Sequence, residues 1–270
     1  MKNYSSIEEQ LFHFSPISLE EMSSIRLMKR TDTKFLTDIS GLRKLLEKVD
    51  GCYFAQEIDG RRVANYATTY WDNAESHWMF RIHHCKHRPR VKVRVRTYVD
   101  SDKSFLEVKR KDNRGKTTKK RIAVPSIEAV VDQHCGEEFL QERAGLSFGD
   151  IVPTLSNRFR RITLVNRDKT ERLTIDYDLH FYNRENGKGI LMDNIVIIEL
   201  KRDGRVPSPI LPMLRELRIK PSGFSKYCIG SAMTNPELKQ NLFKERLTYI
   251  GKVAGPSRAV NVEDIALTHQ

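Results

Sequence analysis

The segment 89–98 alternates apolar and basic residues with a period of two, reading Pro-Arg-Val-Lys-Val-Arg-Val-Arg-Thr-Tyr. This is the period of a β-strand, whose successive side chains point to opposite faces. Three valines share one face and three cations share the other, namely Val91, Val93 and Val95 opposite Lys92, Arg94 and Arg96. Adjacent like charges repel, so water or an anion must lie against the basic row. The segment therefore predicts either a solvated sheet face or a surface suited to phosphate oxygens.

The charge of the whole chain favours an anionic partner. The 270 residues include 47 Lys plus Arg and 35 Asp plus Glu, which gives a formal net charge of +12. Such a balance is typical of proteins that bind nucleic acid, phosphorylated metabolites or acidic membranes. The basic run 109–121 lacks interleaved aromatic residues, so we interpret it as a solvated hairpin and consider nucleic-acid binding unlikely.

The four cysteines and the apolar segments bear on location. Cys52, Cys85, Cys135 and Cys228 are scattered and form no CxxC pair. Together with the absence of an apolar signal core, this favours reduced thiols and a cytoplasmic location. No apolar run approaches the roughly 18 residues of a membrane span. We therefore expect no transmembrane segment in this chain.

The chain is expected to form one mainly β (α+β) domain. Residues 1–25 are weakly patterned and predict an N-terminal arm or docking helix, residues 26–250 the domain, and residues 251–270 a flexible tail. Strands are predicted at 28–36, 63–71, 78–83, 91–98, 104–111, 119–124, 152–163, 172–182 and 194–201. Helices are predicted at 41–49, 126–143, 210–217 and 236–250, the last with Asn235 as N-cap and Pro236 at its first position.

The alternation of charged and apolar residues recurs on several of these strands. Examples are the rows Arg30/Asp32/Lys34, Glu107/Lys109/Lys111, Arg172/Thr174/Asp176 and Ile197/Glu199/Lys201. A half-buried sheet with its polar face in water would also show this pattern. However, the polar rows hold cations and single carboxylates rather than the Thr, Ser and Gln of solvated faces. A closed antiparallel barrel of about eight strands, apolar outward and covered by helices, would turn these charges into a tunnel lining.

The ordered motifs resemble the catalytic domain of the vacuolar transporter chaperone (VTC) family, within the triphosphate tunnel metalloenzymes. The resemblance covers about residues 26–230. It rests on Arg30-x-Asp32-x-Lys34-Phe35, Tyr70-Trp71-Asp72, Lys92-x-Arg94-x-Arg96-x-Tyr98, Phe105-Leu106-Glu107-Val108-Lys109, Arg158, Arg172-x-Thr174-x-Asp176, Ile198-Glu199-Leu200-Lys201 and Phe224-Ser225-Lys226-Tyr227-Cys228. It implies an eight-stranded tunnel that binds ATP by its phosphates and makes inorganic polyphosphate, with a possible membrane-protein partner that receives the product and holds the protein peripherally at a membrane.

The resemblance also implies roles for individual residues. The phosphate-binding set would be Lys34, Arg94, Arg96, Lys109, Arg158, Arg172 and Lys226. Tyr98 and Asp176 would contribute beside them, and Arg160 or Arg161 would be a substitute for Arg158. Glu199 would hold a divalent metal, Mn²⁺ or Mg²⁺.

The first strand departs from the wider superfamily. Its triphosphatases usually carry Glu-x-Glu-x-Lys there, whereas this chain has Arg30-x-Asp32-x-Lys34. A hydrolase must activate water, usually with carboxylates, whereas a terminal phosphate oxygen is already an anionic nucleophile. The sequence therefore favours a polyphosphate polymerase. A tunnel triphosphatase or nucleotide hydrolase, and a non-catalytic binder of polyphosphate or inositol phosphates, remain as alternatives.

Overall fold

The valine face of the segment 89–98 is buried beneath helices, as expected for a strand with its charges turned inward. The computed structural model describes residues 6–23, 25, 30–204, 206–255 and 258–260. In it, β5 (Arg90–Tyr98) packs its three valines against Met79, Val130 and Leu140 from three separate helices. These helices are α4 (Trp78–His84), α5 (Ile127–Gln133) and α6 (Glu137–Ala144). The valines therefore form the packed face of β5, and the basic row lies on the opposite face.

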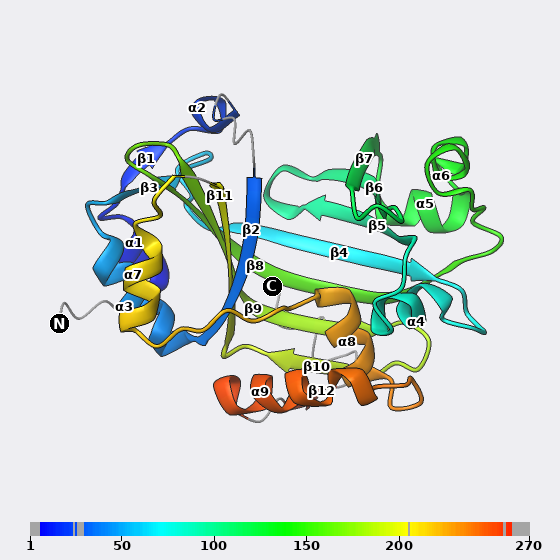
Figure 1. Cartoon of the computed structure of the whole chain (residues 1–270). Coiled ribbons are helices and arrows are strands. Elements are labelled where there is room, and N and C mark those ends of the chain that lie inside the picture. Colours follow the sequence, from blue (N-terminus) through cyan, green and yellow to red (C-terminus); the bar gives the residue numbers. More distant parts are fainter. Residues whose placement is uncertain (1–5, 24, 26–29, 205, 256–257, 261–270) are drawn as a thin grey trace.

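An antiparallel path of eight strands forms the main sheet. In spatial order the path is β2 (Arg30–Asp38), β11 (Ile195–Asp203), β9 (Glu171–Asn183), β8 (Val152–Asn166), β4 (Ala64–Asp72), β5, β6 (Lys103–Lys111) and β7 (Thr117–Val124). Four short strands extend it at the sides: β10 (Gly189–Met192) and β12 (Arg258–Val260) beyond β9, and β3 (Tyr53–Gln56) and β1 (Ser15–Ile17) beyond β8. Figure 1 shows β2 running across β8 and β9 in projection, as in a strongly curled sheet.

The predicted barrel is not closed. The path ends at β2 and β7, and these two described strands share no ladder. A physical reason lies at the free edge of β2. There Phe35 bridges Pro221, and the Ser222 amide donates to the Lys34 carbonyl at 2.8 Å. The segment that leads into α8 (Lys226–Thr234) therefore occupies the edge that a closing strand would need.

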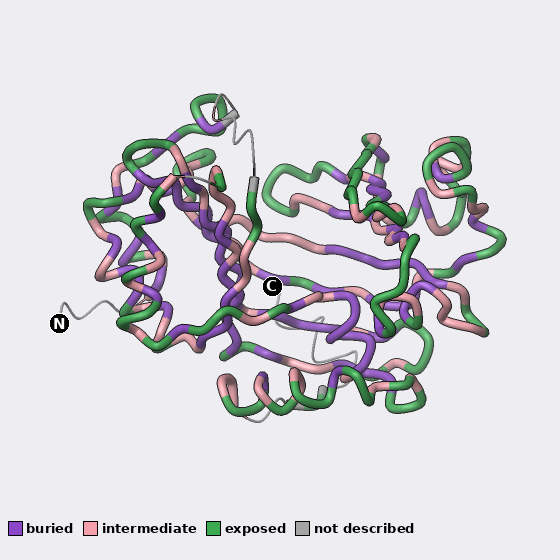
Figure 2. Tube along the Cα trace, viewed as in Figure 1, coloured by how far each residue is buried: buried purple, intermediate pink, exposed green. Residues whose placement is uncertain are grey.

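Four hydrophobic clusters pack on the sheet, the smallest of which joins Ile17 and Met22 to Val165. Beside the valine cluster, a second one joins α1 (Ile7–Leu11), α3 (Ile39–Val49) and α7 (Ile210–Glu216) to the outer faces of β9 and β11. The third cluster lies on the inner face, where α8 and α9 (Lys244–Ala254) pack on Leu155, Leu179 and Phe181. Figure 2 shows in purple the buried residues of the strands and of α8. The inner face therefore has an apolar end filled by α8 and a second end lined by charges.

Several predicted elements differ from those observed. Residues 78–83 form the helix α4 instead of a strand, because the buried Asp72 accepts the Met79 and Phe80 amides at 3.0 and 2.9 Å and fixes the first turn. The predicted helix 126–143 is two helices, separated at His134 and Gly136 in left-handed conformations. The last helix begins at Lys244 rather than 236, and α8 was not predicted.

The predicted terminal segments are only partly covered by the structure. The arm 1–25 contains α1, β1 and α2 (Leu19–Ser23), whereas its first five residues and residue 24 lie outside the described residues. The start of the predicted first strand, 28–29, lies outside them as well. Of the tail 251–270, the end of α9 and β12 are described, but 256–257 and 261–270 are not. None of the described helices has the length and apolar character that a bilayer crossing requires.

Candidate functional site

The inner face of the sheet gathers charged side chains from seven strands and from the start of α8. We call this set the interior cluster. It comprises nine cations, Lys34, Lys92, Arg94, Arg96, Lys109, Lys119, Arg161, Lys201 and Lys226, and three carboxylates, Glu107, Asp176 and Glu199. The formal excess is six positive charges, so the cluster is suited to a polyanion.

The first carboxylate, Glu107, binds two cations across three strands. Arg94 approaches its Oε2 to within 2.6 Å from β5, and Lys119 its Oε1 to 2.5 Å from β7. Glu107 is only 1% exposed. Burial alone would raise its pKa, but the neighbouring cations, above all Arg94, hold the pKa of Glu107 at about 2. The carboxylate is thus charged at neutral pH and fixes the direction of the Arg94 guanidinium.

The second carboxylate, Asp176, joins the sheet to α8. Arg161 on β8 donates two hydrogen bonds to it at 2.6 and 2.8 Å, and the Lys226 ammonium also contacts it. Burial opposes the charge of Asp176, but Arg161 and Lys226 hold its pKa well below the usual range. Burial also lowers the pKa of Lys226 to about 8, despite the opposing effect of Asp176.

The third carboxylate, Glu199, lies between two lysines. Lys34 on β2 approaches it to within 2.9 Å. Lys201, which lies on β11 as Glu199 does, approaches it to within 3.1 Å. Burial would raise the pKa of Glu199, but Lys201 and Lys34 hold it at about 2. The side chain keeps 21% of its surface exposed, so a ligand in the cluster can reach it.

Charges from distant strands of the path approach one another. The pKa of Lys109, on β6, is lowered first by burial and then by Lys92 and Lys34, while Glu199 opposes the shift. In a flat sheet β6 and β11 would be about 24 Å apart, at about 4.8 Å per strand. Such a separation exceeds the screening length of about 10 Å. The curl of the sheet therefore brings β6 opposite β2 and β11.

Aromatic rings and a buried amide line the deeper part of the cluster. The Arg96 guanidinium lies 5.5 Å from the Tyr66 ring centroid and donates to the Thr68 hydroxyl at 3.4 Å. Thr68 is paired directly with Asn157, which is 2% exposed. Both amide atoms of Asn157 are buried with no hydrogen-bond partner among the described residues. Such groups are costly unless a ligand or water satisfies them.

The helix α8 begins at the cluster. Ser225 caps it by accepting the Cys228 amide at 3.3 Å, and the same hydroxyl accepts from Lys92 at 2.9 Å. The first residue of the helix is Lys226. The positive end of the helix dipole therefore adds to the charge of Lys92 and Lys226 where the charged end of the inner face meets its apolar end.

Most of the predicted site residues meet in this cluster. Lys34, Arg94, Arg96, Lys109, Lys226 and Glu199 belong to it, as do Asp176 and the substitute Arg161. Tyr98 is the last residue of β5, at the edge of the cluster, and its hydroxyl accepts a hydrogen bond from Arg121 at 3.3 Å. Arg172 alternates with Thr174 and Asp176 on the same face and donates to the Met22 carbonyl at 3.1 Å, near α2.

Arg158 does not join the cluster. β8 keeps the period of two of a strand here, and the bulge opposite it places its extra residue on β9, where Asp178 has a φ of 53°. The inner face of β8 is formed by Asn157, Phe159 and Arg161, so the exposed Arg158 side chain lies on the outer face. The structure therefore assigns the position opposite Asp176 to Arg161, and the role predicted for Arg158 in the tunnel is corrected.

Sequence reasoning gave no site role to several residues of the cluster. Lys119 and Lys201 bind carboxylates, Glu107 orients Arg94, and Asn157 adds a buried amide. The alternating rows already place Glu107 and Lys201 on inward faces, but they do not predict the ion pairs that these residues form. The contribution of Lys119 depends on the pairing of β6 with β7, which no local pattern encodes.

The interior cluster offers limited ligands for a divalent metal. No group of three His, Cys, Asp or Glu side chains that could hold a metal occurs within the described ranges. Glu199 is one carboxylate, and its two oxygens contact Lys34 and Lys201. Mg²⁺ is often bound by one or two carboxylates together with substrate phosphates and water. The donor set therefore fits a metal that arrives with a phosphate ligand, held by Glu199.

Known proteins resemble this chain in sequence and in fold. The sequence model of the VTC domain matches residues 29–235. Among solved structures, the putative adenylyl cyclase HpAC1 from Hippeastrum, described as having a dominant triphosphatase activity, is 14% identical, with a TM-score of 0.50 over 77% of this chain and 97% of that one. A putative adenylate cyclase from Bacillus halodurans is 10% identical, with a TM-score of 0.48 over 73% and 96%. No curated protein sequence matches.

Proposed function

The chain belongs to the VTC domain family, and we propose that it is an ATP–polyphosphate phosphotransferase. Its fold resembles that of triphosphate tunnel enzymes. The terminal phosphate of ATP would be transferred to a growing chain of inorganic polyphosphate. One observation carries the proposal: the interior cluster holds nine cations, and each of its three carboxylates already binds two of them.

The charge balance supports transfer to phosphate rather than to water. Water must be deprotonated or oriented, and carboxylates usually do this. Here Glu107, Asp176 and Glu199 have low pKa values and are engaged with cations, so they are poor bases. A terminal phosphate oxygen is anionic near neutral pH and needs no base. The six excess charges can hold a triphosphate together with the end of a phosphate chain.

In the proposed reaction, a terminal oxygen of the polyphosphate attacks the γ-phosphorus of ATP. The bond from that phosphorus to the β–γ bridging oxygen breaks, and ADP leaves with the electron pair. Catalysis of this kind requires mainly positioning and stabilisation of the equatorial oxygens. A divalent cation of the kind that the family implies, Mn²⁺ or Mg²⁺, would neutralise phosphate charge when bound at Glu199.

The interior residues divide this work by position. Arg94 and Arg96 would hold the terminal phosphates of the donor, with Arg94 oriented by Glu107. Lys109 and Arg161 would act from the facing strands, and Lys34 and Lys226 would orient the transferred group. Arg172 and Tyr98 lie toward the ends of the inner face and would contact the chain there.

Incubation of the pure protein with ATP and Mn²⁺ or Mg²⁺ tests the proposal. Transfer predicts ADP together with a phosphate polymer that exopolyphosphatase degrades. ADP with an equal amount of orthophosphate would mean a triphosphatase, the activity described for HpAC1. Binding of polyphosphate without turnover of ATP would mean a non-catalytic binder.

The Glu199→Gln variant tests the metal assignment. The substitution keeps the shape of the side chain but removes the charge that the metal requires, so turnover should be lost while cooperative unfolding is retained. The matched control is Glu216→Gln, which removes an exposed carboxylate from a lysine pair on the outside of the molecule. Wild-type turnover in Glu199→Gln would remove Glu199 from the metal site.

A further inference from the structure

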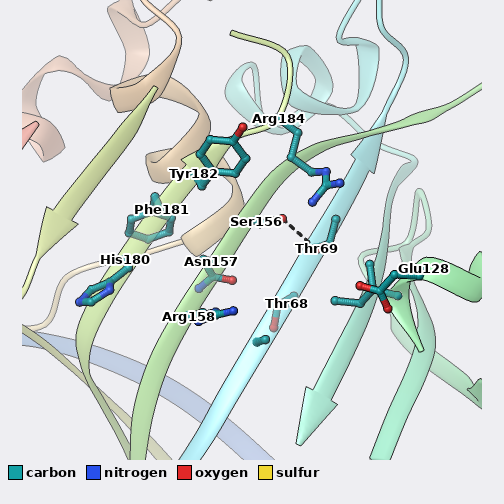
Figure 3. Close-up of a pocket in the computed structure, with 12 residues that line it drawn as sticks. Thr68, Thr69, Glu128, Ser156, Asn157, Arg158, His180, Phe181, Tyr182 and Arg184 are labelled. Carbon is teal, nitrogen blue, oxygen red and sulfur yellow. Dashed lines mark hydrogen bonds between the residues drawn. The ribbon is translucent and has the colours of Figure 1, made fainter. Parts of the chain in front are cut away.

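The outer face of β4, β8 and β9 carries a cavity of about 290 Å³ on the side opposite the interior cluster (Figure 3). Elsewhere the outer faces of β5, β9 and β11 carry apolar residues packed beneath helices, while exposed cations such as Arg110 and Lys120 lie on the outer side of β6 and β7. Around this cavity the outward residues are polar instead, namely Thr69, Ser156, Arg158, His180 and Tyr182, with Arg184 and Glu128 at the rim. We call this cavity the outer groove. Polar side chains on both faces of central strands are unusual and indicate a use beyond packing.

Two arginines of the outer groove are free to bind a ligand. Arg158 and Arg184 are exposed, and neither guanidinium makes a hydrogen bond or an ion pair with another described residue. This differs from Arg94 and Arg161 in the interior cluster, which both bind a carboxylate. Each guanidinium presents five donors in a fixed plane that matches the oxygens of phosphate.

Further hydrogen-bonding groups lie between the two arginines. The Thr69 and Ser156 hydroxyls are 2.9 Å apart on neighbouring strands, and Figure 3 shows Arg184 and Arg158 on either side of them. His180 is 3.0 Å from Asp178 through its Nε2 atom and lines the same groove. The floor therefore offers hydroxyls that can donate or accept, between the two cations.

One carboxylate limits the charge of the ligand. Glu128 extends from α5 at the opposite rim, and the charge of Arg184 contributes to lowering the pKa of Glu128, after its backbone and Ser126 hydrogen bonds. Glu128 is therefore ionised at neutral pH and repels the far side of an anion. The size of the groove also favours a small ligand, since its volume of about 290 Å³ lies just below the range of about 300–1,000 Å³ for small-molecule sites.

From these contacts we propose that the outer groove is a second anion site, which binds a compact phosphate ligand of one or two phosphate groups through Arg158 and Arg184. The Ser156 and Thr69 hydroxyls bind the same oxygens from below. The proposal is independent of the reaction assigned to the interior cluster, because it depends on neither ATP turnover nor a metal. The proposal also assigns a phosphate-binding role to Arg158. The sequence predicted such a role for this arginine, but on the inner face of the sheet instead of the outer one.

The test is a titration of the whole protein with pyrophosphate, followed by NMR of labelled histidine side chains. His180 reports on the groove, and a His180→Gln variant assigns its signal. We expect the signal to shift and saturate in the wild-type protein. In Arg158→Ala/Arg184→Ala the apparent Kd from this signal should rise at least about tenfold, since both charged donors to the phosphate oxygens are removed.

A control with the same loss of charge separates local binding from general attraction. Arg110→Ala/Lys120→Ala removes two exposed cations from β6 and β7, away from the groove, and should leave the apparent Kd within about twofold. Glu128→Gln should tighten binding several-fold, because it removes a repulsive charge. An unmoved His180 signal in the wild-type protein, or the same Kd in both double variants, would overturn the proposal.

Discussion

The interior cluster and the outer groove lie on opposite faces of the same strands, yet they hold their cations differently. Inside, Arg161 donates two hydrogen bonds to Asp176, whereas outside Arg158 has no such partner among the described residues. The difference follows from burial. A charge withdrawn from water needs a fixed counter-charge, while an exposed one is stabilised by solvent. Interior cations are thus part of the folded structure, and groove cations are available to a ligand.

Loss of an interior carboxylate should produce the largest effect. Asp176→Asn leaves Arg161 and Lys226 buried without their counter-charge, which typically costs about 3–5 kcal/mol. We expect the free energy of unfolding, measured by urea denaturation at pH 7, to fall by about that amount. The matched control is Asp178→Asn on the same strand, where the carboxylate is 38% exposed and contacts His180 at the outer groove. A similar loss in both variants would contradict the distinction between the two faces.

Loss of an interior arginine should lower turnover by a large factor. Arg94→Met removes a donor aimed at the proposed transfer site, and removal of one such donor commonly costs about 10²–10³ in rate. We expect ATP turnover to fall by that factor. Arg110→Met is the control, because it removes the same charge from the exposed face of the neighbouring strand. Equal turnover in the two variants would show that net charge matters and that the position of Arg94 does not.

The strands of the inner face could be predicted from the sequence because each one separates charged from apolar residues with a period of two. The row Lys92, Arg94 and Arg96 has this form in the structure. The inward face of β8 could not be predicted, since polar and apolar residues occur on both of its faces: Asn157, Phe159 and Arg161 point inward, whereas Arg158 and Ile162 point outward. Arg158 and Arg161 lie three positions apart and therefore on opposite faces of a strand with a period of two. The choice between them required the pairing partners.

The helix α8 escaped prediction for a related reason. Seven of its nine residues are buried, so it lacks the apolar stripe by which a surface helix is recognised. Its Gly230 lies against Phe181 and Leu155, where an added Cβ would come within 2.4 and 2.9 Å of these side chains. Such a contact is visible only in the folded chain. The same holds for the open seam of the sheet, which depends on Pro221 and Ser222 meeting β2.

Turnover should depend on pH through Lys226, an interior cation. Burial lowers the pKa of Lys226 to about 8. Lys226 is therefore charged at pH 7 and loses its proton as the pH rises through 8, which weakens binding of phosphate. We expect kcat/KM to fall above pH 8, by up to about tenfold per pH unit for a single group. In Lys226→Arg the charge is retained, so the decline should move to higher pH. An unchanged pH profile would exclude Lys226 as the group responsible.

The smallest effect is expected for the outer groove, where the comparison predicts almost no change in stability. Arg158→Ala/Arg184→Ala removes two exposed cations that have no ion-pair partner among the described residues, so the free energy of unfolding should stay within about 0.5 kcal/mol of wild type. Urea denaturation in low and high salt measures it. Because the chain carries a net charge of +12, the variant could gain slightly in low salt, where repulsion between like charges is least screened. A loss approaching that of Asp176→Asn would mean that these arginines support the fold, and it would remove the physical basis for a free anion site on the outer face.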